Sequence, residues 1–271
     1  MRILFIGDVM GRSGRDALAK HMPTLKKALS PDVVIVNGEN SAHGIGITPK
    51  ICEEFYALGV DVITTGNHVW DQREIIPYIA RDPRLLRPLN FPKHTPGEGL
   101  FIHTLPNGSK IAVMNAMARL FMDPLDDPFA KIDDVLQNLK MGQNISAIFI
   151  DFHGEATSEK MALAHYLDGR VSAVVGTHTH MPTADGQILN GGTAFQSDAG
   201  MTGDYNSVIG VKPEISTYRF TRKMPGEKMV PAEGEATVCG CLIVTDDKTG
   251  KATSIDSVII GPRLKNNLPT I

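Results

Sequence analysis

The sequence predicts an α/β protein in which two sheets form an α/β sandwich that carries a small inserted cap. Three observations support this fold class. Short apolar runs rich in β-branched residues alternate with longer helical stretches, which is typical of parallel sheets. Two further segments resemble β-hairpins, so antiparallel strands join the parallel core. A chain of 271 residues with 42% hydrophobic content is long enough to fill a substantial core.

Five apolar runs predict the parallel strands, and each is followed by a loop. Their sequences are RILFI, DVVIVN, DVITT, AIFIDF and SAVVG. Most of these loops lead into helical stretches, which we expect to begin near Arg15, Pro49, Asp71 and Glu155. Strands that alternate with crossover helices in this way indicate a largely parallel arrangement.

Two hairpins predict the antiparallel strands. The first is GLFIHTLPNGSKIAVMNAM, with its turn at residues 106–108, and the second is ATVCGCLIVTDDKTGKATSIDSVII, which turns at residues 246–250. Cys239 and Cys241 alternate in the second hairpin, so we expect both thiols on one buried face of a strand. Mixed strand directions favour a two-sheet sandwich over a barrel.

A segment between Gly200 and Gly234 breaks the pattern. It is rich in Gly, Pro and charged residues, and its periodicity is weak. Loops of this length in compact proteins are usually functional. We therefore predict a core of residues 1–199 and 235–271, with residues 200–234 as an inserted loop or cap that contacts either the substrate or another subunit.

Composition limits the partners and the compartment. The formal net charge is −3 and 21% of the residues are charged, which is neither the basic excess of a nucleic-acid binder nor the bias of a disordered chain. No run approaches the ~20 apolar residues of a membrane span, and the chain does not open on a signal peptide. Three cysteines suit a reducing compartment. We expect a cytoplasmic protein with a small-molecule substrate, no membrane contact and no strong nucleic-acid footprint; a homo-oligomer is compatible with this composition.

Polar residues recur where the predicted parallel strands end. They are Asp8, Glu39, Asn40, Asn67, His68, His153, His178 and His180. Ligands of open α/β sheets bind beyond the carboxyl ends of the strands, so we expect these side chains to converge. A glycine adjoins each strand end and lets the backbone turn sharply and approach closely. Carboxylate, amide and imidazole groups without thiolates suit Mn, Fe or Zn in a site that is not structural.

Each of these residues also has an ordinary structural interpretation. Asp8 or Asn67 could cap the following helix, and His153 alone could be a satisfied interior histidine. Polar residues at five strand ends together favour a functional edge. A phosphate-binding loop is excluded at GDVMGRSGR, because only three residues separate Gly7 from Gly11 and Arg12 follows; the dinucleotide-binding spacing fails as well.

The order of these residues resembles the calcineurin-like metallophosphoesterases, whose pattern runs D-x-H, G-D, G-N-H-[DE], H and G-H-x-H. Two departures are Met10, in the place of the first histidine, and Glu39, in the place of a bridging aspartate. The segments GDVMGRSGR, NGEN and TTGNHVWD are similar to the YmdB-type bacterial subfamily over nearly the whole chain. The resemblance implies an αββα sandwich and hydrolysis of 2',3'-cyclic nucleotides.

The resemblance also implies a binuclear centre of two divalent transition-metal ions, with iron or manganese favoured and zinc allowed. The implied ligands are Asp8, Asn40 and His180 for the first ion, Asn67, His153 and His178 for the second, and Glu39 between them. Asn40 is the candidate for the coordination position that a histidine at residue 10 would have filled.

The implied reaction is in-line attack by a hydroxide that bridges the two ions. His68 has no assigned ion, so it is the candidate general acid for the leaving oxygen. Asp71 either orients His68 or caps the next helix. Alternative functions are a general phosphomonoesterase, and an RNA-binding or partner-binding regulator with a weakly active metal site; the complete ligand set argues against the regulator.

The predicted cap follows the segment FQSDAG and should therefore emerge beside the metal edge. Such a sandwich leaves its metals in an open groove, which alone discriminates poorly among phosphate esters. Tyr205, Asn206, Tyr218 and Arg219 offer aromatic faces and donors for a base and a ribose. We expect selectivity in the cap and chemistry in the core.

Overall fold

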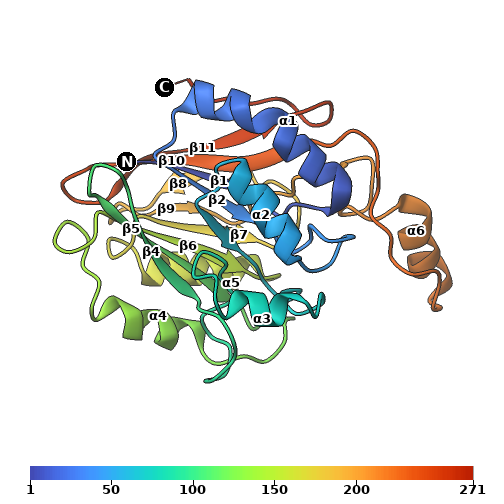
Figure 1. The fold of residues 1–271 in the computed structure, drawn as a ribbon, viewed down its shortest axis with the longest axis horizontal. Coiled ribbons are helices and arrows are strands. Elements are labelled where there is room, and N and C mark those ends of the chain that lie inside the picture. Colours follow the sequence, from blue (N-terminus) through green and yellow to red (C-terminus); the bar gives the residue numbers. More distant parts are fainter. Residues whose placement is uncertain (271) are drawn as a thin grey trace.

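The computed structural model describes residues 1–270 as two stacked sheets with helices on both outer faces (Figure 1). The first sheet has five strands in the order β11-β10-β1-β2-β3. They are β1 (Arg2–Ile6), β2 (Val33–Asn37), β3 (Val62–Thr64), β10 (Val238–Thr245) and β11 (Ala252–Ile260). The second has six in the order β4-β5-β6-β7-β9-β8. They are β4 (Leu100–Thr104), β5 (Lys110–Met117), β6 (Ala147–His153), β7 (Ala173–Thr177), β8 (Gln187–Ile188) and β9 (Ala194–Gln196).

The helices complete a layered sandwich, which confirms the predicted fold class. They are α1 (Gly11–Leu29), α2 (Pro49–Ala57), α3 (Ile75–Ile79), α4 (Pro128–Leu136), α5 (Thr157–Tyr166) and α6 (Pro213–Arg222). Helices α1 and α2 cover the first sheet, α4 and α5 cover the second, and α6 projects from the side (Figure 1). Within residues 1–270, no helix combines the length and the apolar character needed to cross a membrane.

Side chains that alternate along β1 explain why the layers stack. Leu4 and Ile6 face the helices and join the apolar cluster beneath α1 and α2. Ile3 and Phe5 face the second sheet, where the ring of Phe5 lies 5.0 Å from that of Phe149 on β6. A third buried cluster fills the space under α4 and α5. The central strands of each sheet are therefore buried on both faces and read as nearly continuous apolar runs, whereas the edge strands β4, β8 and β11 are partly exposed.

Strand directions follow the predicted division into parallel and antiparallel parts. Strands β1, β2 and β3 are parallel to one another, as are β5, β6 and β7. Both hairpins are present as the antiparallel pairs β4–β5 and β10–β11. Cys239 and Cys241 are buried on β10 as expected. Parallel strands in both sheets therefore point their carboxyl ends toward the same edge of the sandwich.

Helix boundaries differ from those expected at two places. Helix α1 begins at Gly11, not near Arg15, because the Gly11 N–H bonds to the Asn40 carbonyl at 2.8 Å and the chain enters the helix directly from the strand end. Helix α3 begins at Ile75, not near Asp71. Helices α4 and α6 and the short strands β8 and β9 were not expected from the sequence.

Residues 200–234, here called the cap, connect the second sheet to the first. The cap is anchored by a small apolar cluster in which Met10 of the core packs with Met201, Val211 and Ile215. Val211 also pairs with Pro231 as an isolated bridge. The chain therefore leaves and re-enters this anchor at one place. Residues 212–230, here called the distal cap, project from it with α6, whose Ile215 packs into the anchor.

Candidate metal centre and active site

The seven predicted metal ligands lie at one edge, where the carboxyl ends of β1, β2, β3, β6 and β7 meet. Contacts of 3.2 Å or less connect all of them into one group. They are Asp8, Glu39, Asn40, Asn67, His153, His178 and His180. The expectation that five strand ends converge is therefore met by the geometry.

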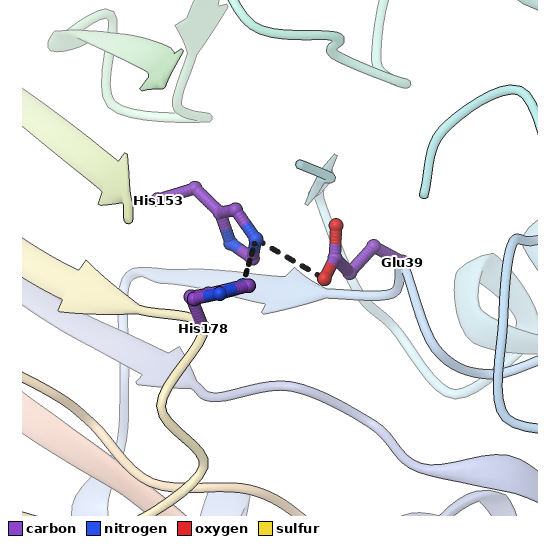
Figure 2. A group of neighbouring side chains, drawn as sticks. All are labelled: Glu39, His153 and His178. Carbon is purple, nitrogen blue, oxygen red and sulfur yellow. Dashed lines mark hydrogen bonds and ion pairs between the residues drawn. The ribbon is translucent and has the colours of Figure 1, made fainter. Parts of the chain in front are cut away.

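His153 lies at the centre of the tightest part of this group (Figure 2). Its Nε2 is 3.1 Å from Glu39 Oε1 and 3.1 Å from His178 Nδ1. Asn67 Oδ1 lies 2.9 Å from the same nitrogen. One ligand atom each from Glu39, His153 and His178 falls within 4.8 Å of the other two. Small side-chain shifts would bring such atoms to metal–ligand distances of about 2.0–2.2 Å.

Asn40, His180 and Asp8 form the adjoining part of the group. Asn40 Nδ2 lies 3.0 Å from His180 Nε2, and rotation of the amide would present Oδ1 there instead. Asp8 Oδ2 accepts the His178 backbone N–H at 3.2 Å, whereas Asp8 Oδ1 is buried with no hydrogen-bond partner. A buried carboxylate oxygen without a partner is costly, and a cation beside it would remove the cost.

The electrostatics of the group favour positive charge. Burial alone would lower the pKa of His153, but the Glu39 and Asp8 carboxylates outweigh it and raise the pKa to about 9. Burial would raise the pKa of Glu39, but His153 lowers it to about 2. Burial, reinforced by the charge of His153, lowers the pKa of His178 to about 3 and keeps that imidazole neutral. The residues present therefore fit divalent cations held by oxygen and imidazole ligands.

Gly66 shows how closely these groups approach the backbone. A Cβ at this position would lie 2.3 Å from Glu39 Oε2 and 2.3 Å from His153 Cδ2. Any side chain would therefore displace two of the candidate ligands. The predicted role of a strand-end glycine in close approach is confirmed at this position.

The two histidines of the Thr177–His180 turn have strained backbones that a buried ion pair holds. His178 has φ of 99° and His180 has φ of 68°, in the left-handed region. Lys160 Nζ donates to the Thr177 carbonyl at 2.8 Å and to Asp198 Oδ2 at 3.0 Å. Thr179 donates its N–H and its hydroxyl to the same carboxylate oxygen. This clamp presents both imidazoles to the site.

A second buried network orients His153. Asp151 accepts hydrogen bonds from Asn37 Nδ2 at 2.9 Å, Thr64 Oγ1 at 2.5 Å and Thr177 Oγ1 at 2.7 Å. Because the Thr177 hydroxyl donates its proton to Asp151, it accepts the Nδ1–H of His153 at 2.9 Å. Burial raises the pKa of Asp151 to about 6, so the carboxylate is ionised above that pH. His153 Nε2 thereby faces the other candidate ligands Glu39, Asn67 and His178, where it can act as a metal ligand.

His68, the predicted general acid, stands at the rim of this group. Its Nδ1–H donates to Asp71 Oδ2 at 2.5 Å, and its backbone N–H donates to Glu39 Oε2 at 3.2 Å. Glu74, not Asp71, precedes α3. Of the two interpretations of Asp71, the structure shows the contact with His68.

A cavity of about 560 Å³ opens over the metal edge between the core and the cap. The core wall includes the candidate catalytic and metal-binding residues Glu39, Asn40, His68, His178 and His180, together with Met10, His43, Gly44, Ile45, Glu155 and Thr179. The cap wall consists of Ile209, Val211, Arg219, Lys228, Met229 and Pro231. The cap therefore emerges beside the metal edge, as expected, although the domain boundaries stay a prediction.

Of the four cap residues expected to contact substrate, only Arg219 lines this cavity. Tyr205 lies beneath it, and its hydroxyl donates to the His180 carbonyl at 3.2 Å. Tyr218 faces a separate hollow beside α6. The carbonyl of Ile209 accepts the Nδ1–H of His180 at 2.7 Å, so the part of the cap nearest the core orients a candidate ligand.

Four supporting residues of the site were not predicted from the sequence. Glu155 lies 3.3 Å from His178 Nε2 and Asp198 clamps the histidine turn. Glu155 follows the predicted strand AIFIDF, so the strand-end pattern could have included it. Asp198 follows β9, a strand that was not expected from the sequence. Asp151 lies within an apolar strand and Lys160 lies within a helix, where nothing in the sequence distinguishes them from ordinary residues.

Known proteins resemble this chain over nearly its whole length. The chain is 48% identical over 260 residues to the 2',3'-cyclic-nucleotide 2'-phosphodiesterase of Bacillus subtilis (strain 168), covering 96% of this chain and 97% of that protein. A crystal structure of a hypothetical protein from Thermus thermophilus superposes with a TM-score of 0.90 at 41% identity, covering 97% of this chain and 100% of that one.

A crystal structure of a phosphatase from Mycoplasma pneumoniae also superposes with a TM-score of 0.90, at 32% identity and with 96% of this chain and 93% of that chain covered. A family profile described as YmdB-like protein matches residues 4–258. This match includes every candidate ligand and confirms the resemblance inferred from the motifs. The chain therefore belongs to the YmdB-like protein family.

Proposed function

We propose that this protein is a metal-dependent phosphodiesterase that hydrolyses 2',3'-cyclic nucleotides. The observation that carries the proposal is the buried group of oxygen and imidazole ligands in which Asp8 Oδ1 lacks a partner. The Bacillus subtilis relative, which is named for this activity, supports the choice of substrate. Three free, buried cysteines agree with action in the cytoplasm.

The ligand assignment follows the two parts of the group. Asp8, Asn40 and His180 would hold one ion, and Asn67, His153 and His178 would hold the other, with Glu39 between them. Iron or manganese fits this donor set best, and zinc is also compatible. When bound, two such cations supply an activated water and neutralise the charge that develops on phosphorus during in-line displacement.

The chain's own residues provide the remaining proton transfer. His68 lines the cavity, and its Nδ1–H is held by Asp71, so Nε2 faces the substrate side. Protonated Nε2 donates its proton to the ribose oxygen that leaves phosphorus, and the bond to Asp71 holds the ring in this orientation. The nucleotide product then carries a phosphomonoester on its neighbouring oxygen.

The test combines metal analysis with a substrate panel. Protein purified without chelator should contain close to two transition-metal ions per chain by elemental analysis. Turnover should be fastest with nucleoside 2',3'-cyclic phosphates, slower with 3',5'-cyclic phosphates and slowest with nucleoside monophosphates. A preference for monophosphates would favour the phosphomonoesterase, and no more than one ion after reconstitution would contradict the binuclear site.

A further inference from the structure

We propose that Arg219 and Lys228 form a second phosphate subsite on the cap wall, which binds a phosphate attached to the 5'-oxygen of the substrate nucleotide. This inference rests on the proposed function, since it extends the substrate of the same cavity. A phosphate on the 5'-oxygen has two sources: the 5'-phosphate of a free nucleotide, or the phosphodiester that joins a terminal nucleotide to an RNA strand.

The two cations have no anionic partner. The ion pairs that Lys and Arg side chains form among residues 1–270 involve other residues. Arg219 Nη2 donates only to the Glu227 carbonyl at 3.3 Å, and Arg219 Nε is buried without a partner. A guanidinium offers five donors and prefers to bind phosphate through two of them. The cap wall therefore presents unused donors and unpaired positive charge to the cavity.

Charge is segregated across the cavity. The carboxylates that line it, Glu39 and Glu155, both lie at the metal edge, next to His153 or His178. The cap wall adds apolar side chains such as Ile209 and Met229 but no carboxylate. One end of the cavity thus suits the reacting phosphate, the apolar part suits a base and a ribose, and the cationic part suits another anion.

A nucleoside 2',3'-cyclic phosphate carries only one phosphate, and the reaction requires that phosphate at the metal edge. A substrate with this single phosphate therefore offers no anionic partner to Arg219 and Lys228. The 5'-oxygen lies on the opposite side of the ribose, so a phosphate there would supply the second charge. The cavity volume of about 560 Å³ lies in the usual range for ligands larger than a bare phosphate ester.

The experiment compares three substrates: adenosine 2',3'-cyclic phosphate, its 5'-phosphorylated form, and a dinucleotide that ends in a 2',3'-cyclic phosphate. For the wild-type protein, KM should be about tenfold lower when the 5'-phosphate is present. The double variant Arg219→Ala/Lys228→Ala should lose this advantage, while KM for adenosine 2',3'-cyclic phosphate stays within about twofold.

The matched control is Arg222→Ala/Lys223→Ala, which removes two charges near the end of α6 that do not line the cavity. It should keep the advantage of the 5'-phosphate. If KM is lower only for the 5'-phosphorylated adenosine 2',3'-cyclic phosphate, the substrate is a free nucleotide. If KM is lower for the dinucleotide as well, the substrate is an RNA end. Equal losses on all three substrates in the double variant would overturn the subsite, because the two cations would then attract any anion.

Product binding separates this inference from the proposed function. Calorimetry should show that adenosine 3',5'-bisphosphate binds the wild-type protein about tenfold more tightly than adenosine 3'-phosphate does, and that the double variant binds both alike. Equal binding by the wild-type protein would overturn the subsite. Activity on a small aryl phosphodiester without any 5'-phosphate advantage would contradict only the subsite, whereas absence of all phosphodiesterase activity would contradict the proposed function.

Discussion

The core wall and the cap wall of the cavity differ in burial, bonding and charge. In the core wall, Glu39 is fully buried and His180 is 7% exposed, and bonded networks behind the wall fix the imidazoles. In the cap wall, Ile209 is 52% and Met229 is 50% exposed, and its two cations are unpaired. A reaction at metal ions requires ligands held in one geometry, whereas selection among nucleotides needs a surface that the substrate itself completes. We therefore expect substitutions in the core wall to slow the reaction itself, and substitutions in the cap wall to reduce selectivity among substrates.

The largest effect is expected from removing a core ligand. Asn67→Ala or His178→Ala should lose at least one metal ion and lower kcat by on the order of 10³-fold or more, because the ion supplies the nucleophile and the charge stabilisation. Elemental analysis and turnover measure both effects. Asn206→Ala and His165→Ala, which remove the same groups outside the cluster, are the matched controls. Two retained ions in Asn67→Ala would contradict its assignment as a ligand.

His68→Ala should separate proton transfer from metal binding. It should keep its fold and its metal content, yet lower kcat on 2',3'-cyclic nucleotides by about 10²- to 10⁴-fold. An aryl phosphodiester with a good leaving group should lose much less, since its leaving oxygen scarcely needs a proton. If His68→Ala loses metal as readily as Asn67→Ala, His68 is a ligand and not the general acid.

The buried Lys160–Asp198 clamp behind the histidine turn should contribute more to the free energy of unfolding than any surface ion pair does. Lys160 and Asp198 are each 1% exposed, so Lys160→Met leaves a buried carboxylate without its cation. We expect a loss of about 3–5 kcal/mol in the free energy of unfolding, measured with urea, and a partial recovery in Lys160→Met/Asp198→Asn. The exposed pair Lys131–Asp126, at 3.1 Å, is the control and should contribute less than about 1 kcal/mol. Equal losses from both pairs would show that the buried pair is not a clamp.

The charge at the centre of the core wall predicts a pH dependence for protein treated with chelator. The pKa of His153 is 6.5 in the unfolded chain and about 9 in the folded protein, so its stabilisation is complete below pH 6.5 and is lost as the pH rises through 9. The free energy of unfolding should fall by on the order of 3 kcal/mol over this window. His153→Gln should flatten the profile and His165→Gln should not. Parallel profiles for all three proteins would assign the pH dependence elsewhere.

The core wall could be predicted from the sequence, and most of the cap wall could not. Each core ligand follows an apolar strand, so the strand-end pattern located Asp8 and His153 although they are far apart in the chain. Helix α6 was not expected because only Ile215 and Ser216 are buried along it, which leaves no apolar periodicity. The aromatic character of Tyr205 suggested a contact with substrate, but burial of its hydroxyl against the His180 carbonyl depends on tertiary packing.

The hydrogen-bonded networks behind the core wall could not be predicted from the sequence either. The clamp pairs a lysine on α5 with an aspartate after β9, and Asp151 bonds to residues of the opposite sheet. Such pairs depend on how layers stack, and local patterns carry no information about stacking. Motifs therefore identify groups that follow strand ends, while the residues that hold them in place require the three-dimensional structure.

The division of labour between the two walls is tested most directly by replacing the distal cap with a short Gly-Ser linker. Val211 and Pro231 already pair, so the linker closes without strain, and the contacts of Tyr205 and Ile209 with His180 stay in place. We predict a KM for 5'-phosphorylated nucleoside 2',3'-cyclic phosphates raised by tenfold or more, roughly 1.4 kcal/mol, with turnover of a small aryl phosphodiester within a fewfold of the wild type. An equal loss on both substrates, in a variant that is folded and retains its metals, would contradict the account.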